Sequence, residues 1–161
     1  MAHRWSRILA FAVALATPVA ASADYSCLAS TTGTINFLQY NPTSATPSTA
    51  SATATLKCSY VSGNTQSVAW TMQLSNGSSG NCAGRALPGP GASLSYNIYQ
   101  NSVAGGAWGN AGCGSYPAGT AKVSNGQPTE TVTRTLYGQI PASQFVGTGT
   151  YMESLTLTVT Y

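Results

Sequence analysis

The segment Ser154–Tyr161, SLTLTVTY, alternates strictly between apolar and polar side chains. Leu155, Leu157, Val159 and Tyr161 fall on one side, and threonines separate them. A period of two residues is that of a β-strand with one buried and one solvated face. A strand this apolar needs a partner along both edges, because a free edge invites other chains to pair with it. The sequence therefore raises the question of what lies beside this strand.

The same alternation recurs along the chain, and no segment after residue 23 has the period of a helix. Turn signals such as the Asn76-Gly77 pair separate the alternating segments. Strands are predicted at residues 32–40, 50–60, 67–75, 84–87, 92–100, 129–141 and 151–161, with a long glycine-rich connection over 101–128. Short strands separated by turns predict an all-β fold, an antiparallel β-sandwich. The buried face of 129–141 is left open, because Arg134 alternates in step with Val132 and Leu136.

Residues 1–23 have the pattern of a secretory signal peptide. Arg4 and Arg7 precede a short apolar run, ILAFAVALA, and small residues end at Ala23. The run is short for a membrane-spanning helix, so we expect cleavage after Ala23, export, and no membrane anchor. Residues 24–161 are then enough for one domain with one core. They carry four cationic and three anionic side chains, too few for a nucleic-acid or polybasic membrane surface.

The four cysteines are Cys27, Cys58, Cys82 and Cys113. An even number in an exported chain predicts disulfides. Three pairings are possible, of which the sequential one (first with second, third with fourth) closes two loops of equal length. On the chain-entropy account each such closure would stabilise the fold by about 3–4 kcal/mol. A zinc site is disfavoured, because there is no Cys-x-x-Cys pair and His3 lies in the signal peptide.

The inventory of reactive side chains argues against an enzyme. No histidine follows residue 23, so no serine or cysteine has one to activate it. Glu130 and Glu153 are far apart in sequence, and each lies at the start of a predicted strand, where we expect a solvated position. No glycine-rich segment enters a helix as phosphate binding requires. The sequence therefore predicts no catalytic, cofactor-binding or metal site.

An ordered series of segments carries a family resemblance. The segments are INFLQYNP, KCSY, LSNGSSG, RAL, LSYNIY, WGN, LYGQIPASQFVGTGTY and LTLTVTY. Their order and spacing resemble the spore coat protein U domain, whose members include subunits of archaic, Csu-type chaperone–usher pili. The resemblance covers nearly all of residues 24–161. It implies an incomplete immunoglobulin-like antiparallel β-sandwich that lacks its final strand, in a protein without enzymatic activity.

The resemblance also implies partners and a site. In the family, a periplasmic pilus chaperone first fills the place of the missing strand, and at the outer-membrane usher an extension of the neighbouring pilin subunit replaces it. Such a protein is exported through the periplasm to the cell surface or an extracellular fibre. Transferred to this chain, the walls of the donor-strand groove would be formed by Leu155, Leu157, Val159 and Tyr161 on one side and Ile35 and Phe37 on the other. Binding would proceed by β-strand addition, in which backbone hydrogen bonds form and alternate side chains enter the core.

One feature departs from the family pattern. Polymerising members have a dozen or more alternating residues before the first cysteine, and those residues form the donor strand. Here only Asp24, Tyr25 and Ser26 lie between the predicted cleavage site and Cys27, a span of at most about 10 Å. The expectation is therefore an acceptor that does not donate, in a terminal, tip-type position. A fragment of a two-domain tip adhesin, and a self-contained spore-coat or extracellular binding protein outside any pilus, remain as alternatives.

Tryptophans and loops give the last predictions. Trp70 alternates with inward residues and is expected in the core. Trp108, in a glycine-rich loop, is expected to plug one end of the sandwich, with an exposed contact as the alternative. In a tip protein the loops 86–92 and 102–119 could adhere to apolar surfaces, although simple connection between strands is favoured. The residues that would make that contact are Leu87, Val103, Trp108 and Tyr116.

Overall fold

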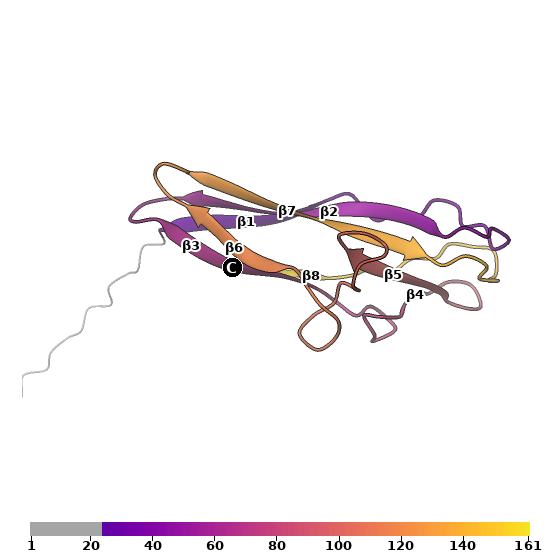
Figure 1. Cartoon of the computed structure of the whole chain (residues 1–161). Helices are drawn as coiled ribbons and strands as arrows, with labels where there is room; N and C mark the ends of the chain where they lie inside the picture. The colour runs from indigo at the N-terminus through magenta and orange to yellow at the C-terminus, as the bar shows by residue number, and fades with distance from the viewer. Residues whose placement is uncertain (1–23) are drawn as a thin grey trace, which may run out of the picture.

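The computed structural model describes residues 24–161 as eight antiparallel β-strands in two packed layers (Figure 1). The predicted signal peptide and its cleavage site lie outside these residues. The five-stranded layer has the order β1 (Tyr25–Thr32), β2 (Ser48–Tyr60), β7 (Thr129–Ile140), β5 (Leu94–Gln100), β4 (Arg85–Leu87). The three-stranded layer has the order β6 (Ala118–Val123), β3 (Gln66–Leu74), β8 (Leu157–Thr160). The predicted all-β sandwich is confirmed. Within 24–161 no helix is long and apolar enough to cross a membrane.

The core follows the alternation seen in the sequence. Inward residues of β2, β3 and β5 are buried: Ala54, Leu56, Cys58, Val68, Trp70, Met72, Leu74, Leu94, Tyr96 and Ile98. On β7, Val132 and Leu136 are buried, which settles the face that the sequence left open. Arg134 shares that face, and its guanidinium lies 5.0 Å from the centre of the Trp70 ring. The cation is thus accommodated between the layers by an aromatic face.

Residues 32–40 do not form the predicted strand. β1 ends at Thr32, and Gly33 turns the chain with a φ of 76°. Leu38 has a φ of 57°, which interrupts an extended conformation. The C-terminal strand is likewise shorter than predicted, because β8 pairs with β3 only over Leu157–Thr160. Both segments have the pattern of a strand but lack a neighbour to pair with.

Two strands were not predicted. β1 pairs with β2 from Tyr25 onwards, although its outward residues are mostly serine and threonine. β6 lies inside the region expected to be a connection, and it pairs with β3. Only Ala121 and Val123 of β6 are buried, so its sequence shows little periodicity.

The disulfides have the sequential pairing. Cys27 and Cys58 are directly opposite each other on β1 and β2, with their Cα atoms 4.0 Å apart. The Cα atoms of Cys82 and Cys113 are 5.8 Å apart, and this bridge joins two loops near β4. Each bridge closes a separation of 31 residues.

Candidate functional site

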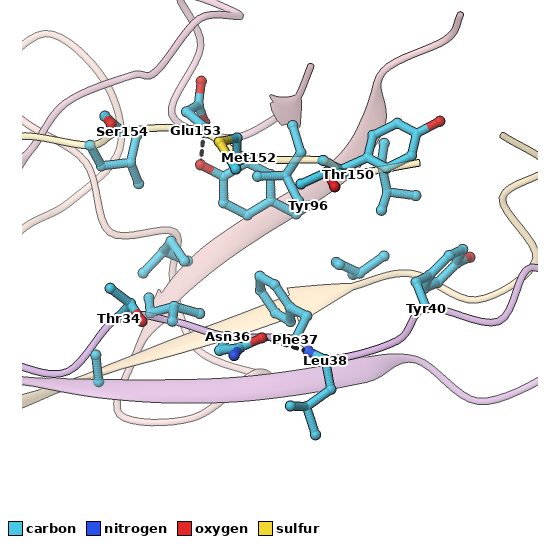
Figure 2. A pocket seen from close by; sticks show the side chains of 18 of the residues that line it. Thr34, Asn36, Phe37, Leu38, Tyr40, Tyr96, Thr150, Met152, Glu153 and Ser154 are labelled. Atoms are coloured by element: carbon cyan, nitrogen blue, oxygen red, sulfur yellow. Dashed lines mark hydrogen bonds between the residues drawn. The ribbon is translucent and has the colours of Figure 1, made fainter. Parts of the chain in front are cut away.

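A groove of about 960 Å³ opens between the two layers (Figure 2). One side is residues 33–40, here called the N-terminal wall, and the other is residues 146–157, the C-terminal wall. Between them the groove is lined by inward side chains of β2, β3, β4, β5 and β7: Ala52, Leu74, Leu87, Leu94, Tyr96, Ile98, Leu136 and Ile140. The lining is therefore largely apolar and continuous with the core.

The backbones of both walls are largely unpaired. Within 24–161, residues 33–40 make no backbone–backbone hydrogen bond. Across residues 150–155 only the Met152 amide makes one, to the Pro88 carbonyl at 3.3 Å. β8, which continues the C-terminal wall, is an edge strand that pairs with β3 alone. Two unpaired backbone edges therefore flank an apolar groove, and such edges can accept an added strand.

The structure brings together four of the six residues predicted for the groove. Ile35 and Phe37 lie in the N-terminal wall, Leu155 and Leu157 lie in the C-terminal wall, and all four are half-buried. The other two, Val159 and Tyr161, lie outside the lining: Val159 pairs with Met72, and Tyr161 is 49% exposed after the end of β8. Their place beside an added strand stays a prediction, since both follow the groove along the edge strand β8.

The N-terminal wall is packed against β7 at a glycine. A Cβ atom on Gly138 would lie 2.6 Å from Cζ of Phe37 and 2.8 Å from Cγ2 of Ile35. Gly138 therefore provides the space into which these two side chains fit. Phe37 also meets the ring of Tyr96 edge-on, with the ring centres 6.3 Å apart.

Sequence reasoning missed the role of Glu153, which was expected to be solvated. Glu153 alternates in step with Leu155 and Leu157, so it points toward the groove side and is half-buried. Its carboxylate accepts hydrogen bonds from the Tyr96 hydroxyl and the Ser78 amide. Among the described residues that line the groove it is the one formally charged side chain. The alternation could have placed it, but nothing in the sequence identified its partners.

The pKa values of this cluster follow from burial and hydrogen bonding. Burial alone would raise the pKa of Glu153, but the hydrogen bonds from Ser78 and Tyr96, with the nearby Arg85 charge, outweigh it and lower that pKa. Burial and the Glu153 carboxylate together raise the pKa of Tyr96 far above its ordinary value. Burial lowers the pKa of Arg85, partly offset by Tyr96 and Glu153. At neutral pH Glu153 is therefore an anion and Tyr96 a neutral donor.

Behind the C-terminal wall, Arg85 joins several loops. It is 1% exposed, and its guanidinium donates five hydrogen bonds. Two go to the carbonyl of Ser75, and one each to the carbonyls of Cys82 and Trp108 and to Oδ1 of Asn97. Ser75 in turn pairs with Thr156 of the wall through its amide and its hydroxyl. This network joins the loops that carry Ser75, Cys82 and Trp108 to the C-terminal wall at Thr156.

The predicted adhesive residues do not form one exposed patch. Trp108 is 1% exposed, so it is buried and offers no exposed contact in this structure. Leu87 is half-buried and lines the groove. Val103 and Tyr116 are half-buried in the loop that Cys113 closes. Their adhesive role stays a prediction.

The family model of the Spore Coat Protein U domain matches residues 13–158. Among solved structures, the chain is similar to one in the CsuC–CsuE chaperone–tip adhesion subunit pre-assembly complex from archaic chaperone–usher Csu pili of Acinetobacter baumannii. The TM-score is 0.52 at 20% identity, over 85% of this chain and 40% of that chain, so this chain spans about two fifths of its length. The likeness shows the shared immunoglobulin-like fold. Comparison with curated proteins finds no match.

Proposed function

This chain belongs to the spore coat protein U domain family, and from that membership we propose that it is a secreted structural or adhesive subunit of a chaperone–usher surface pilus, without enzymatic activity. The observation that carries the proposal is the pair of unpaired backbone edges on either side of the apolar groove. The printed description of the similar solved structure, a chaperone–tip adhesion subunit complex, supports the same assignment. Residues 24–161 hold no group of three or more histidine, cysteine or acidic side chains suited to a metal ion.

The proposed action of the groove is to accept a donor strand. An extended segment lying between residues 33–40 and 150–157 would pair its backbone with both walls, and its alternate side chains would enter the core. About four inward side chains fit along an eight-residue wall, because successive side chains of a strand point to opposite faces. At about 1.5–3 kcal/mol each, apolar side chains there would contribute about 6–12 kcal/mol before the cost of ordering the strand. That is comparable with the whole stability of a small domain.

The proposed occupants are a strand of a periplasmic pilus chaperone and then, at the outer-membrane usher, a strand of the neighbouring pilin subunit. We also propose a terminal, tip-type position. This proposal depends on the predicted cleavage after Ala23 and on β1, which pairs with β2 from Tyr25 onwards and so leaves no residue from there to Thr32 free to donate. Sequencing the N-terminus of the exported protein tests it: an extension of a dozen residues before Tyr25 would contradict the tip-type position.

Thermal unfolding of the oxidised, exported protein tests the pilus assignment. It would be measured alone, with the pilus chaperone, and with a synthetic peptide of alternating apolar residues. A peptide of the same composition in shuffled order is the control. We expect the protein by itself to be weakly stable. Its Tm should rise by more than about 10 °C with the chaperone or the alternating peptide, but not with the shuffled peptide. A high Tm alone, unchanged by any strand, would instead favour a self-contained extracellular binding or structural protein.

A further inference from the structure

Three side chains connect the two walls of the groove across its interior. Glu153 of the C-terminal wall accepts a hydrogen bond from the hydroxyl of Tyr96 on β5. The ring of Tyr96 in turn packs edge-on against Phe37 of the N-terminal wall, at 6.3 Å between ring centres. Figure 2 shows Phe37 and Tyr96 facing each other, and the hydrogen bond that continues from Tyr96 to Glu153. The separation of the walls at this point is therefore set by Tyr96.

The C-terminal wall is also attached to its surroundings at Tyr151, whose hydroxyl donates to the Pro90 carbonyl at 3.1 Å, and at two further points. Thr156 binds Ser75 at one end, and the Met152 amide reaches the Pro88 carbonyl at 3.3 Å. Between these points the wall is held by Glu153, whose second oxygen accepts the amide of Ser78. Apolar walls facing an empty groove gain by closing on each other, since closure removes apolar surface from water. The hydrogen bonds from Tyr96 and Ser78 to Glu153 fix the position of this wall and so oppose that closure.

Burial and a nearby positive charge strengthen the hydrogen bond between Tyr96 and Glu153. Tyr96 is 5% exposed, so its hydroxyl depends on the carboxylate as its acceptor. Arg85 is fully buried nearby on β4, and its five hydrogen bonds go to neutral acceptors. Its charge therefore favours the Glu153 anion through space rather than in an ion pair. Charge-assisted hydrogen bonds of this kind are about twice as strong as neutral ones.

From these contacts we propose that Glu153 and Tyr96 are positioning residues for strand insertion, which hold the C-terminal wall at the distance from the N-terminal wall that an incoming β-strand requires. The inference rests on the proposed function of the groove, and it adds a specific pair of residues on which insertion depends. Neither residue needs to contact the inserted strand for this role. Their effect is on how often the groove is open, and so on the rate at which a strand enters it.

The test compares three variants in the exported protein. E153Q removes the charge, and Y96F removes only the hydroxyl while keeping the ring that contacts Phe37. E130Q is the matched control, since Glu130 also accepts a backbone amide, that of Lys122, but does not line the groove. The readout is the association rate of the chaperone or of the alternating peptide, by fluorescence or surface plasmon resonance. We expect E153Q and Y96F to slow association about tenfold at neutral pH, and E130Q to stay within about twofold of wild type.

A pH series separates positioning from a merely structural role. The groups that face Glu153 are Tyr96 on β5, Arg85 on β4 and the Ser78 amide, and Glu153 is the one of them that titrates in acid. The wild-type rate should therefore fall as the pH drops below 4.5, the ordinary glutamate value, whereas the E153Q rate should stay flat.

Three results would overturn this inference while leaving the proposed function intact. They are association at the wild-type rate in E153Q and Y96F, an equal loss of rate in E130Q, and identical pH profiles in wild type and E153Q. If the wild-type protein binds no strand at all, the proposed function fails first, and the inference fails with it. The two failures are thus distinguishable by the wild-type measurement.

Discussion

The indole Nε1 of Trp108 donates a 2.8 Å hydrogen bond to the backbone carbonyl of Met72. Met72 lies near the C-terminal end of β3 and is fully buried, so this bond ties the loop over residues 101–117 to the core of the smaller layer. Trp108 also presents its own carbonyl to Arg85. The loop is thus held from two sides at a single residue.

Removing this attachment should destabilise the whole domain. Trp108→Ala creates a large cavity and leaves the Met72 carbonyl unpaired, so we expect a loss of about 3–5 kcal/mol in the free energy of unfolding. Trp108→Phe, which mainly removes the donor, should cost about 1–3 kcal/mol. Urea denaturation of the oxidised protein measures both. Ser102→Ala, exposed in the same loop, is the control and should change stability by less than about 0.5 kcal/mol.

Arg85 should tolerate no replacement, including lysine. Its planar guanidinium donates hydrogen bonds in different directions to the carbonyls of Ser75, Cys82 and Trp108, and the ammonium of a lysine cannot reach all of them. We expect Arg85→Lys to lower the free energy of unfolding by about 3 kcal/mol or more, because it leaves buried acceptors unpaired. Arg134→Lys, at a half-buried cation over Trp70, is the comparison and should cost about 1 kcal/mol or less. Equal losses in the two variants would contradict the importance of the five-bond network.

The strands that could be predicted are those whose alternation is enforced by a buried face. β2, β3 and β5 have apolar residues at every second position, so a shift of one residue would expose all of them. β6 could not be recognised, because it contributes only Ala121 and Val123 to the core. Its pairing is decided by β3, a tertiary contact that local sequence does not encode.

The groove shows a different limit of sequence reasoning. Residues 32–40 alternate like a strand, yet in the isolated chain they form none, since strand formation requires a neighbouring backbone. The apolar residues Ile35, Phe37, Leu155 and Leu157 were placed near the groove by a family resemblance rather than by pattern alone. Glu153 was misjudged because its partners Tyr96 and Ser78 are distant in sequence.

The two disulfides should differ in what their removal disturbs. Both close loops of the same length, a separation of 31 residues, so the chain-entropy contribution of each is about 3–4 kcal/mol. The first joins strands that already pair, whereas the second holds the loops around Arg85 and Trp108.

Replacing Cys82 and Cys113 together by alanine should therefore cost more than replacing Cys27 and Cys58. Denaturation midpoints, with amide exchange of the Trp108 loop, measure the difference. Greater exchange in that loop is expected only when the second bridge is absent, and equal protection in both variants would contradict this.

Acid should weaken the domain through Glu153. Its pKa is lowered in the folded protein, so its stabilising contribution is complete above the ordinary value of 4.5 and is lost as the pH falls through the lowered folded value. Thermal unfolding between neutral pH and about pH 2 should show a decline that is shallower in Glu153→Gln. A wild-type slope unchanged by this substitution would show that other carboxylates account for the acid sensitivity.

Leu38 gives a prediction that separates the empty groove from the filled one. Its φ of 57° is unfavourable for a residue with a Cβ, and its side chain is 86% exposed and points away from the groove (Figure 2). Leu38→Gly should relieve that strain and stabilise the empty form by about 1 kcal/mol. An added strand would draw residues 33–40 into an extended conformation, in which glycine is less favourable than leucine, so the same substitution should weaken strand binding about fivefold or more. Leu38→Ala keeps the Cβ and removes the exposed apolar group, so it controls for solubility. Urea denaturation and peptide titration measure the two effects, and a gain in both stability and strand affinity would show that the wall keeps its kink when a strand is bound.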